Sequence, residues 1–314
     1  MAQTPQQATG APVAVPVSGT VLVTGGGGFA GGHLLRALRG AQARAPGHRE
    51  LDLLDTAAVD GFMEREQPAA IVHLAGFSSP RLSWDTPGQV LSDNVQMTLN
   101  VLEAARHRAP SARIVLAGSG QVYGPAALLP IDEATPLNPP NPYAVSKAAC
   151  DLLGGQYQMA FELSVVRLRP FNHAGPGQTD EYVVSSLCRQ VAEAEVAGRP
   201  QALIQTGDVS ARRDFTDVRD VVRAYVSAIS AEPGVYNVCS GRSVPVSHLV
   251  ELVEGCARVP VRHEIVDSRR RSNEPSELRG SHERLTAATG WRPEIPLEQT
   301  ISDTLDWWRT RLTT

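Results

Sequence analysis

The stretch VLVTGGGGFAGGHLL, residues 21–35, joins a short apolar run to four consecutive glycines and then to the start of an amphipathic pattern. The apolar run predicts a strand over Val21–Val23, and the leucines that follow the glycines predict a helix. Glycines also recur at three-residue spacing, at Gly25, Gly28 and Gly31. This arrangement is typical of a strand that turns sharply into a helix.

The three spaced glycines have separate uses in such a turn. Gly25 allows the tight turn, Gly28 lets a diphosphate approach the backbone, and Gly31 lets the helix lie close on the sheet. The first N–H groups of the helix are free donors with a partial positive charge, which favours the diphosphate. The alternative is a flexible glycine-rich surface loop, but strand and helix patterns flank the glycines directly. We therefore predict a dinucleotide-binding turn.

Length and charge narrow the class of protein. The chain has 314 residues, enough for two domains of ordinary size. Its net charge of −4 gives no basic field for nucleic acid or an anionic membrane, and no apolar run is long enough to span a bilayer. Residues 1–18 are rich in Ala, Gln, Pro and Thr and lack Lys and Arg, which predicts a disordered arm rather than a signal peptide.

Cysteine and histidine spacing indicates neither disulfides nor a metal. The four cysteines stand far apart and form no CxxC pair, so we expect buried thiols in a reducing compartment, with the cytoplasm as the expected location. The histidines form no HxxxH or HxH pair, so no metal site is predicted.

Apolar strands and amphipathic helices alternate along the first half of the chain. After the glycine turn, strands are predicted over 41–45, 49–55, 69–76, 113–119 and 163–168, and helices over 56–66, 87–107 and 143–161. Beyond Gly175 the alternation loosens. Helices are predicted there near 183–197, 218–230 and 247–256, with a strand at 234–239.

This order predicts an α/β protein with a doubly wound parallel Rossmann sheet and a smaller C-terminal α/β substrate-binding lobe. The expected divisions are the disordered arm over 1–18, an NAD(P)-binding domain over 19–174 with 211–241, and the lobe over 175–210 with 242–314.

Three polar residues stand where the predicted sheet presents its carboxyl edge, beyond which ligands bind in such folds. Ser119 ends a predicted strand, and Tyr143 and Lys147 stand four residues apart on one side of a predicted helix. An ammonium near a phenol favours the phenolate, so we expect a lowered pKa of Tyr143. Such a phenol exchanges a proton with an alcohol or ketone while a nicotinamide carries the hydride, and Ser119 can hydrogen-bond the same oxygen. The alternative is a tyrosine and a lysine on a solvated helix face, but the glycine turn and Ser119 favour chemistry.

These motifs occur in an order that resembles the extended short-chain dehydrogenase/reductases, the NAD-dependent epimerase/dehydratase family. The matching motifs are Thr24-Gly25-x-x-Gly28-x-x-Gly31, Ser119, Tyr143-x-x-x-Lys147 and Arg169-x-x-Asn172, within a resemblance that covers about 20–308. Segments 170–178, 213–220 and 235–241 look closest to GDP-4-keto-6-deoxymannose reductases, which form GDP-rhamnose. The resemblance implies an NAD(P)-dependent oxidoreductase that acts on a nucleotide-diphosphate sugar, with a GDP-sugar favoured. It also implies a homodimer packed through the helices at 87–107 and 143–161.

The resemblance assigns roles to individual positions. Catalysis is expected from Ser119, Tyr143 and Lys147. Cofactor contacts are expected from Gly25, Gly28, Phe29, Ala30, Gly31, Arg44, Asp52, Leu53, Leu74, Ala75, Gly76, Asn94, Tyr143, Lys147 and Pro170. Substrate contacts are expected from Ser78, Ser83, Gln121, Asn172, His173, Arg213, Arg271 and Glu274.

Some of these positions have a simpler alternative. Arg213 and Arg271 match arginines that bind the nucleotide's diphosphate and ribose, which suits their paired donors, but Arg269–Arg271 is also typical of a solvated charge run. Glu274 matches an acidic position that binds a base or ribose hydroxyl. His73 is expected to be a hydrogen-bonded histidine at a strand end rather than a catalytic group.

One departure from the dehydratases of this family restricts the reaction. In those enzymes an acidic residue after the catalytic Ser or Thr removes the proton alpha to the 4-keto group, whereas Gln121 here is an uncharged amide. A 4,6-dehydratase is therefore disfavoured. Reduction of a C4 ketone is preferred, and 4-epimerisation by oxidation and re-reduction is the alternative. A non-enzymatic NAD(P)-binding regulator is disfavoured because Ser119, Tyr143 and Lys147 occur together.

The choice between NADP and NAD depends on the end of the second predicted strand. An NAD enzyme usually has Asp or Glu there to bind the adenosine ribose, but the segment 41–45 carries Arg44 and no acidic residue. Arg44 suits a 2′-phosphate, so NADP is slightly preferred and NAD is the alternative. Asp52 and Leu53 are expected to frame the adenine.

Overall fold

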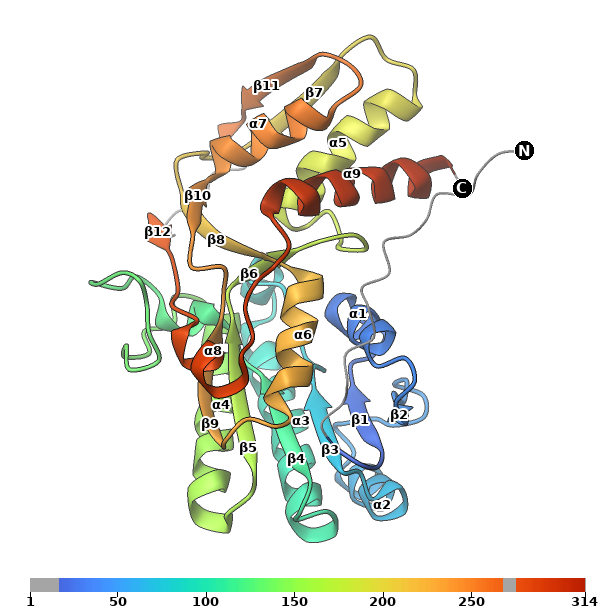
Figure 1. Cartoon of the computed structure of the whole chain (residues 1–314), viewed down its shortest axis with the longest axis vertical. Coiled ribbons are helices and arrows are strands. Elements are labelled where there is room, and N and C mark those ends of the chain that lie inside the picture. Colours follow the sequence, from blue (N-terminus) through green and yellow to red (C-terminus); the bar gives the residue numbers. More distant parts are fainter. Residues whose placement is uncertain (1–16, 268–274, 314) are drawn as a thin grey trace.

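A computed structural model of the chain describes residues 17–267 and 275–313, so the predicted arm over 1–18 lies almost wholly outside the described residues. Its centre is a parallel sheet of six strands in the order β2-β1-β3-β4-β5-β9 (Figure 1). These strands are β1 (Val21–Thr24), β2 (Ala43–Arg44), β3 (Ala70–His73), β4 (Arg113–Ala117), β5 (Val165–Pro170) and β9 (Gly234–Val238). Because every pair in this sheet is parallel, the predicted doubly wound α/β fold is confirmed.

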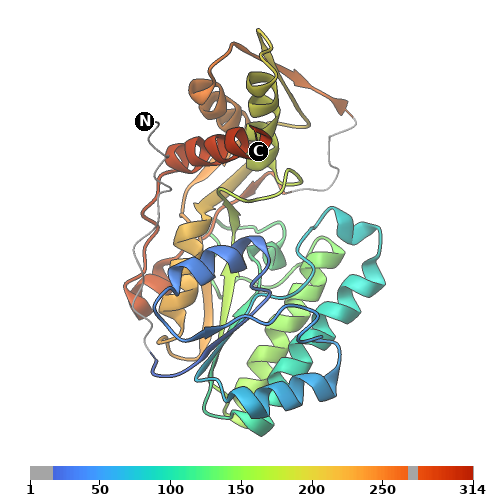
Figure 2. The ribbon, with the colours of Figure 1, turned by 90° about the vertical axis from the view of Figure 1, so that its right-hand side faces the viewer.

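Helices cover both faces of this sheet, because successive side chains of a strand point to opposite faces (Figure 1; Figure 2). Val23 and Val72 pack with the first helix group and Leu22 and Ile71 with the second. The first group is α1 (Phe29–Ala37) and α6 (Val218–Ala228), and the second is α2 (Thr56–Glu66), α3 (Pro87–Arg108) and α4 (Pro142–Phe161). Among the described residues, no helix is both long and apolar enough to cross a membrane.

A smaller group of elements lies beyond the carboxyl edge of the sheet, at the top of Figure 1. Its own core includes Leu187, Leu249 and Ile301. The elements are β6 (Asn172–Ala174), α5 (Val183–Val196), β7 (Ala202–Thr206), β8 (Arg212–Asp217), β10 (Ser243–Pro245), α7 (Val246–Cys256), β11 (Val261–Ile265), β12 (Glu277–Leu278) and α9 (Leu297–Thr313). Strand β8 pairs with β6, β10 and β12, and β7 pairs with β11.

Three short elements complete the described chain. Helix α8 (Glu283–Thr289) packs on β9 and α6, and so lies with the central sheet although it follows β12 in the sequence. The single-turn helices η1 (Leu82–Trp84) and η2 (Gly120–Tyr123) follow β3 and β4. Both of these turns therefore lie at the carboxyl edge of the sheet, where the site was predicted.

The strand predicted over 49–55 is wrong, because this segment is a loop whose leucines Leu51 and Leu53 are buried. The Oδ1 atom of Asp52 accepts the backbone N–H of Leu54 at 2.9 Å, and the Asp55 side chain caps α2. These carboxylates bind backbone donors locally, which competes with pairing in a sheet. The other strands and helices predicted in the sequence are present, with ends shifted by a few residues.

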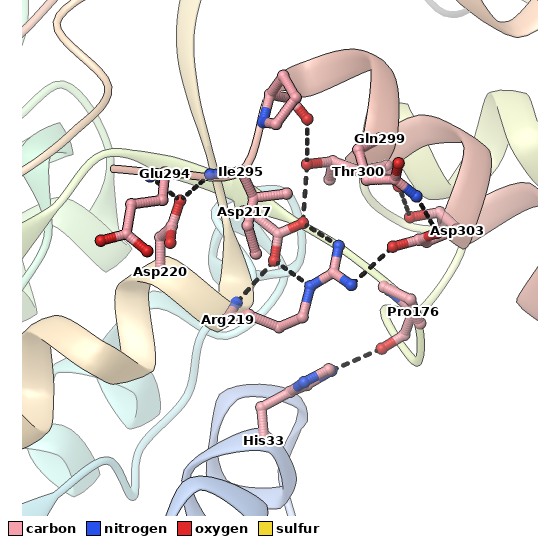
Figure 3. A network of polar contacts seen from close by, with 12 residues as sticks. His33, Pro176, Asp217, Arg219, Asp220, Glu294, Ile295, Gln299, Thr300 and Asp303 are labelled. Carbon is pink, nitrogen blue, oxygen red and sulfur yellow. Dashed lines mark hydrogen bonds and ion pairs between the residues drawn. The ribbon is translucent and has the colours of Figure 1, made fainter. Parts of the chain in front are cut away.

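A buried polar network fixes the smaller group of elements to the sheet (Figure 3). Asp217, at the start of α6, accepts two hydrogen bonds from the Arg219 guanidinium at 2.8 and 2.7 Å, and Arg219 also pairs with Asp303 of α9 at 2.6 Å. The Nε2 atom of His33 in α1 lies 2.7 Å from the carbonyl oxygen of Pro176. Because α1 and α6 both pack on the sheet, these contacts hold α9 and the loop after β6 in place.

The glycine turn is as close-packed as its sequence predicts. Gly25 has φ of +74°, and a Cβ there would stand 2.6 Å from the backbone nitrogen of Ala75. A Cβ on Gly31 would overlap the carbonyl oxygen of Gly25. Helix α1 therefore lies directly on the turn, which only a residue without a side chain permits.

We expect Gly31→Ala to lower the free energy of unfolding by roughly 1–3 kcal/mol, because the new methyl group forces α1 off the turn. Gly32→Ala in the same helix is the matched control. Its Cβ would meet only the end of the Arg36 side chain, at 3.9 Å, so the better helix propensity of alanine should leave stability equal or higher. Urea unfolding of both variants measures the difference, and equal destabilisation by the two would contradict this packing.

Candidate active site

The start of α4 carries two of the residues for which chemistry was predicted. Asn141 is the N-cap residue and its side chain accepts the backbone N–H of Ala144 at 2.8 Å, while Pro142 takes a first-turn position where no N–H donor is needed. Tyr143 and Lys147 face the interior, and each is 8% exposed. The Asn-Pro pair therefore fixes where α4 begins, and so fixes the positions of Tyr143 and Lys147 along the helix.

The Lys147 ammonium lies at the carboxyl end of β4. Its Nζ donates to the carbonyl oxygen of Ala117 at 2.9 Å, and burial lowers the pKa of this lysine. Ser119 follows closely, and its hydroxyl accepts the backbone N–H of Gln121 at 3.2 Å. The Ser119 side chain also interacts with that of Tyr143. The three predicted catalytic side chains are therefore brought together at the end of this strand.

The predicted lowering of the Tyr143 pKa is wrong. Burial is the largest effect and raises this pKa to about 12, the interaction with Ser119 lowers it by less, and the nearby Tyr182 raises it. The Lys147 ammonium is hydrogen-bonded to the Ala117 carbonyl, and its charge does not offset the loss of solvent around the phenol. Tyr143 is therefore protonated at neutral pH, in the state that donates a proton.

Gln121 has a definite place beside these groups. Its Oε1 accepts a hydrogen bond from Nδ2 of Asn141 at 3.2 Å, so the turn after Ser119 is tied to the start of α4. A neutral amide cannot remove a proton from carbon, so this position holds no base. The geometry agrees with the expectation that dehydration is disfavoured.

The glycine turn brings backbone groups to the site rather than side chains. Gly28 is the N-cap of α1, so no side chain covers this helix end, and the first-turn N–H groups at Phe29 and Ala30 can bind an anion. Ala75, just after β3, bounds the other side of the turn, within 2.6 Å of where a Cβ on Gly25 would stand. A cradle of bare backbone fits the diphosphate of a dinucleotide.

The residues predicted around the adenosine are only partly as expected. Arg44 ends β2, and its guanidinium pairs with Glu50 at 2.5 Å and Glu66 at 3.3 Å, so two carboxylates share the charge predicted for a 2′-phosphate. Asp52 is half-exposed beside this strand. The Leu53 side chain is buried in the core, and the contact of this residue with adenine stays a prediction.

Asn94 supports the site from within. Its Oδ1 accepts the backbone N–H of Phe77 at 2.7 Å, and its Nδ2 donates to the Phe77 carbonyl and to Oγ of Ser146 at 3.2 and 2.8 Å. Its polar atoms thus hold the turn that follows Gly76 against α4, and its contact with the cofactor stays a prediction. Leu74 and Pro170 lie at the ends of β3 and β5, as predicted.

His73 is confirmed as a structural histidine. Its Nδ1 lies 2.7 Å from the hydroxyl of Thr24 and its Nε2 lies 3.3 Å from the hydroxyl of Thr98. Burial lowers its pKa to about 3, so the ring is neutral. Both nitrogens are occupied within the fold.

The predicted substrate residues lie in separate parts of the chain, and the structure describes only some of them. Asn172 of β6 pairs with Phe215 of β8, and Arg213 lies on β8 two residues before that paired position. The His173 ring stacks on that of Phe29, with centroids 6.0 Å apart, which joins this region to the glycine turn. The remaining two, Arg271 and Glu274, lie outside the described residues.

The loop after β3 holds two residues predicted to contact substrate and lies against one that was not predicted. Ser83 is fully buried and donates to the Pro80 carbonyl at 2.7 Å, and its substrate contact stays a prediction. Ser78 is exposed, and its carbonyl accepts the Tyr182 hydroxyl at 3.0 Å. Tyr182 precedes α5 and lies close enough to Tyr143 to raise its pKa. Sequence reasoning missed it, because only the packing of α5 over the sheet brings it to the site.

We expect Tyr143 not to ionise near neutral pH, since burial keeps its phenol protonated. Ultraviolet difference titration of the cofactor-free protein from about pH 6 to pH 10, compared with Tyr143→Phe, measures this. The two curves should coincide up to about pH 9. A phenolate that forms near pH 7 in the wild type only would mean that the Lys147 charge outweighs burial.

The sequence matches the NAD dependent epimerase/dehydratase family over residues 21–239. It is 40% identical to a GDP-6-deoxy-D-mannose reductase of Pseudomonas aeruginosa over 93% of this chain and 98% of that protein. It is 30% identical to a UDP-glucose 4-epimerase of Mycolicibacterium smegmatis, over 83% of this chain and 82% of that protein.

Two similar solved structures are of the same two kinds of enzyme. The structure of RMD from Pseudomonas aeruginosa complexed with NADPH superposes with a TM-score of 0.84 and 36% identity, covering 94% of this chain and all of that one. A UDP-glucose 4-epimerase from Thermus thermophilus in complex with NAD gives a TM-score of 0.80 at 28% identity, over 92% of this chain and 99% of that one. The chain therefore belongs to the NAD dependent epimerase/dehydratase family.

Proposed function

We propose that the protein is an NAD(P)H-dependent reductase of the C4 ketone of a nucleotide-activated 4-keto-6-deoxyhexose, of the type that converts GDP-4-keto-6-deoxymannose to GDP-rhamnose. The observation that carries this proposal is a protonated, buried Tyr143 phenol beside Ser119 and Lys147. The 40% identical relative, which this chain matches over nearly its whole length, is a GDP-6-deoxy-D-mannose reductase, and this supports the same reaction class.

The chemistry divides between cofactor and protein. Bound NADPH supplies the hydride that ends on C4. Tyr143 donates its proton to the C4 oxygen, so that the carbonyl becomes an alcohol, and the Ser119 hydroxyl hydrogen-bonds the same oxygen and holds it in line. The Lys147 ammonium then stabilises the phenolate left on Tyr143, which recovers a proton from water.

The substrate is held by the residues beyond the carboxyl edge. We propose that residues 19–174 with 211–241 form the cofactor-binding domain and residues 175–210 with 242–314 the substrate-binding lobe, and that Asn172 and Arg213 of the first domain also contact the substrate. Arg213, together with Arg271, suits the diphosphate and ribose of the nucleotide, because guanidinium donors bind such oxygens in pairs. Asn172 suits the sugar or its diphosphate, and Glu274 suits a ribose or base hydroxyl.

Two observations favour NADP over NAD. Arg44 ends β2 where NAD enzymes usually carry an acidic residue, and the structure of the Pseudomonas aeruginosa relative was solved with NADPH. NAD is the alternative, because Glu50 and Glu66 already pair with Arg44. The place of action we propose is the cytoplasm, since all four cysteines are free thiols.

A nucleotide-sugar 4-epimerase is the second candidate, because relatives with that name are 27–30% identical. An epimerase oxidises C4 and then reduces it again, so it retains NAD and consumes none. We therefore expect stoichiometric oxidation of NADPH with GDP-4-keto-6-deoxymannose, faster than with NADH, followed by absorbance and product analysis. Interconversion of UDP- or GDP-hexoses without net oxidation would contradict the reductase.

Tyr143→Phe separates chemistry from binding in the same assay. The variant keeps the ring but cannot donate a proton, so turnover should fall at least about 100-fold. NADPH affinity, measured by quenching of protein fluorescence, should stay within about twofold. Near-full activity of Tyr143→Phe would rule out this mechanism, whatever the substrate.

We further propose that two copies pair through α3 and α4. Val145, Leu152 and Met159 recur at seven-residue spacing on α4, and they are 40%, 62% and 81% exposed. Leu91 adds an exposed apolar side chain on α3. Such a stripe on neighbouring helices favours self-association.

Sedimentation equilibrium should give twice the 33.6 kDa mass of one chain. Leu152→Glu combined with Met159→Glu should shift the mass to that of one chain, because the two carboxylates cannot be buried unpaired. Exposed Leu128→Glu, on a loop away from both helices, is the control and should remain paired. A single-chain mass for the wild type would exclude the dimer.

A further inference from the structure

A buried chain of hydrogen bonds runs behind the candidate active site. Asp151 stands one turn after Lys147 in α4 and is 2% exposed. Its carboxylate accepts two bonds from Arg169, from Nε at 2.8 Å and from Nη2 at 2.9 Å. The remaining Arg169 nitrogen, Nη1, donates to the Tyr123 hydroxyl at 2.8 Å, which donates in turn to Oδ1 of Asn237 at 2.8 Å. The chain thus crosses α4, β5, η2 and β9.

Strand β5 holds the Ser119 turn at both of its ends, through the Leu168 carbonyl at the start and through the Arg169 side chain at the end. Before Ser119, Gly118 donates its N–H to the Leu168 carbonyl at 2.7 Å, and a Cβ on Gly118 would stand 3.6 Å from Cγ of Arg169. After Ser119, η2 closes at Tyr123, whose hydroxyl binds Arg169. The Ser119 turn is therefore fixed to β5 at both ends, and the buried Arg169 guanidinium makes the contact at its far end.

The same guanidinium holds the helix of the other two catalytic residues. Asp151 and Lys147 lie four residues apart and so share a side of α4, with Tyr143 one turn earlier. The bidentate pairing of Arg169 with Asp151 fixes both the direction and the distance of α4 relative to β5. Arg167 adds a further bond to the same carboxylate at 3.1 Å. No part of this chain of contacts needs to touch a substrate.

Stability alone does not explain the buried Arg169–Asp151 pair, because well-packed apolar side chains often replace a buried ion pair without loss of stability. What apolar side chains do not provide is a directional link between two separate parts of a site. We propose that Arg169, Asp151 and Tyr123 are positioning residues that set Ser119 against Tyr143 and Lys147. This inference rests on the proposed function for its kinetic test, but not for its structural one.

Tyr123→Phe is the sharpest variant, since it removes the link to Arg169 and Asn237 and keeps the ring and the ion pair. We expect kcat to fall about 10- to 100-fold with the KM for NADPH unchanged, as for loss of an orienting contact. Tyr157→Phe is the matched control. That tyrosine is also buried, but it lies on α4 ten residues after Lys147 and its hydroxyl bonds Glu103 of α3, so kcat should not change.

A double-mutant cycle separates positioning from general destabilisation. If Tyr123 acts through Ser119, then Tyr123→Phe should lower kcat by less than about threefold in a Ser119→Ala background. An equal loss in both backgrounds, or a kcat within twofold of wild type for Tyr123→Phe alone, would overturn the proposal.

Hydrogen exchange gives a readout that needs no turnover. The backbone amides of residues 119–124 should exchange faster in Tyr123→Phe than in the wild type, and those of 143–151 should not change in Tyr157→Phe. Unaltered exchange over 119–124 would overturn the proposal even if the wild type were inactive. An inactive wild type with the expected exchange would instead count against the proposed reaction alone.

Discussion

The arrangement of the site depends on the hydrogen bond from the Lys147 ammonium to the Ala117 carbonyl. A buried ammonium is costly unless it is hydrogen-bonded, so the end of β4 is one of few places where this side chain can lie. The bond sets the register of α4 along the sheet and therefore the position of Tyr143, one turn earlier. Because β4 leads directly to Ser119, the same contact relates all three of the proposed catalytic residues to one strand end.

Much of this was predictable from the sequence, for physical reasons that can be named. The glycine turn follows from local spacing, since only Gly25 and Gly31 can approach their backbone neighbours so closely. The meeting of Ser119 with Lys147 follows from a rule of parallel sheets, that carboxyl ends of strands gather at one edge.

The parts that sequence reasoning missed depend on contacts between distant segments. No local feature of the sequence distinguishes 49–55 from a strand. The segment forms a loop because the Asp52 and Asp55 side chains accept hydrogen bonds from nearby backbone N–H groups, which competes with pairing to a neighbouring strand. Tyr182 reaches the site only when α5 packs over the sheet. The pKa of Tyr143 was misjudged because sequence gives the neighbouring charge but not the depth of burial, and burial has the larger effect.

That pKa also bears on which reaction the chain is built for. An epimerase begins with oxidation, in which Tyr143 must accept a proton and therefore start as the phenolate. Burial raises the pKa of Tyr143 to about 12, which favours the phenol over the phenolate. A reductase starts instead from the phenol, which these surroundings keep, and a dehydratase needs a further base, which Gln121 cannot provide. Of reduction, 4-epimerisation and 4,6-dehydration, reduction is the reaction that this chain's own residues favour.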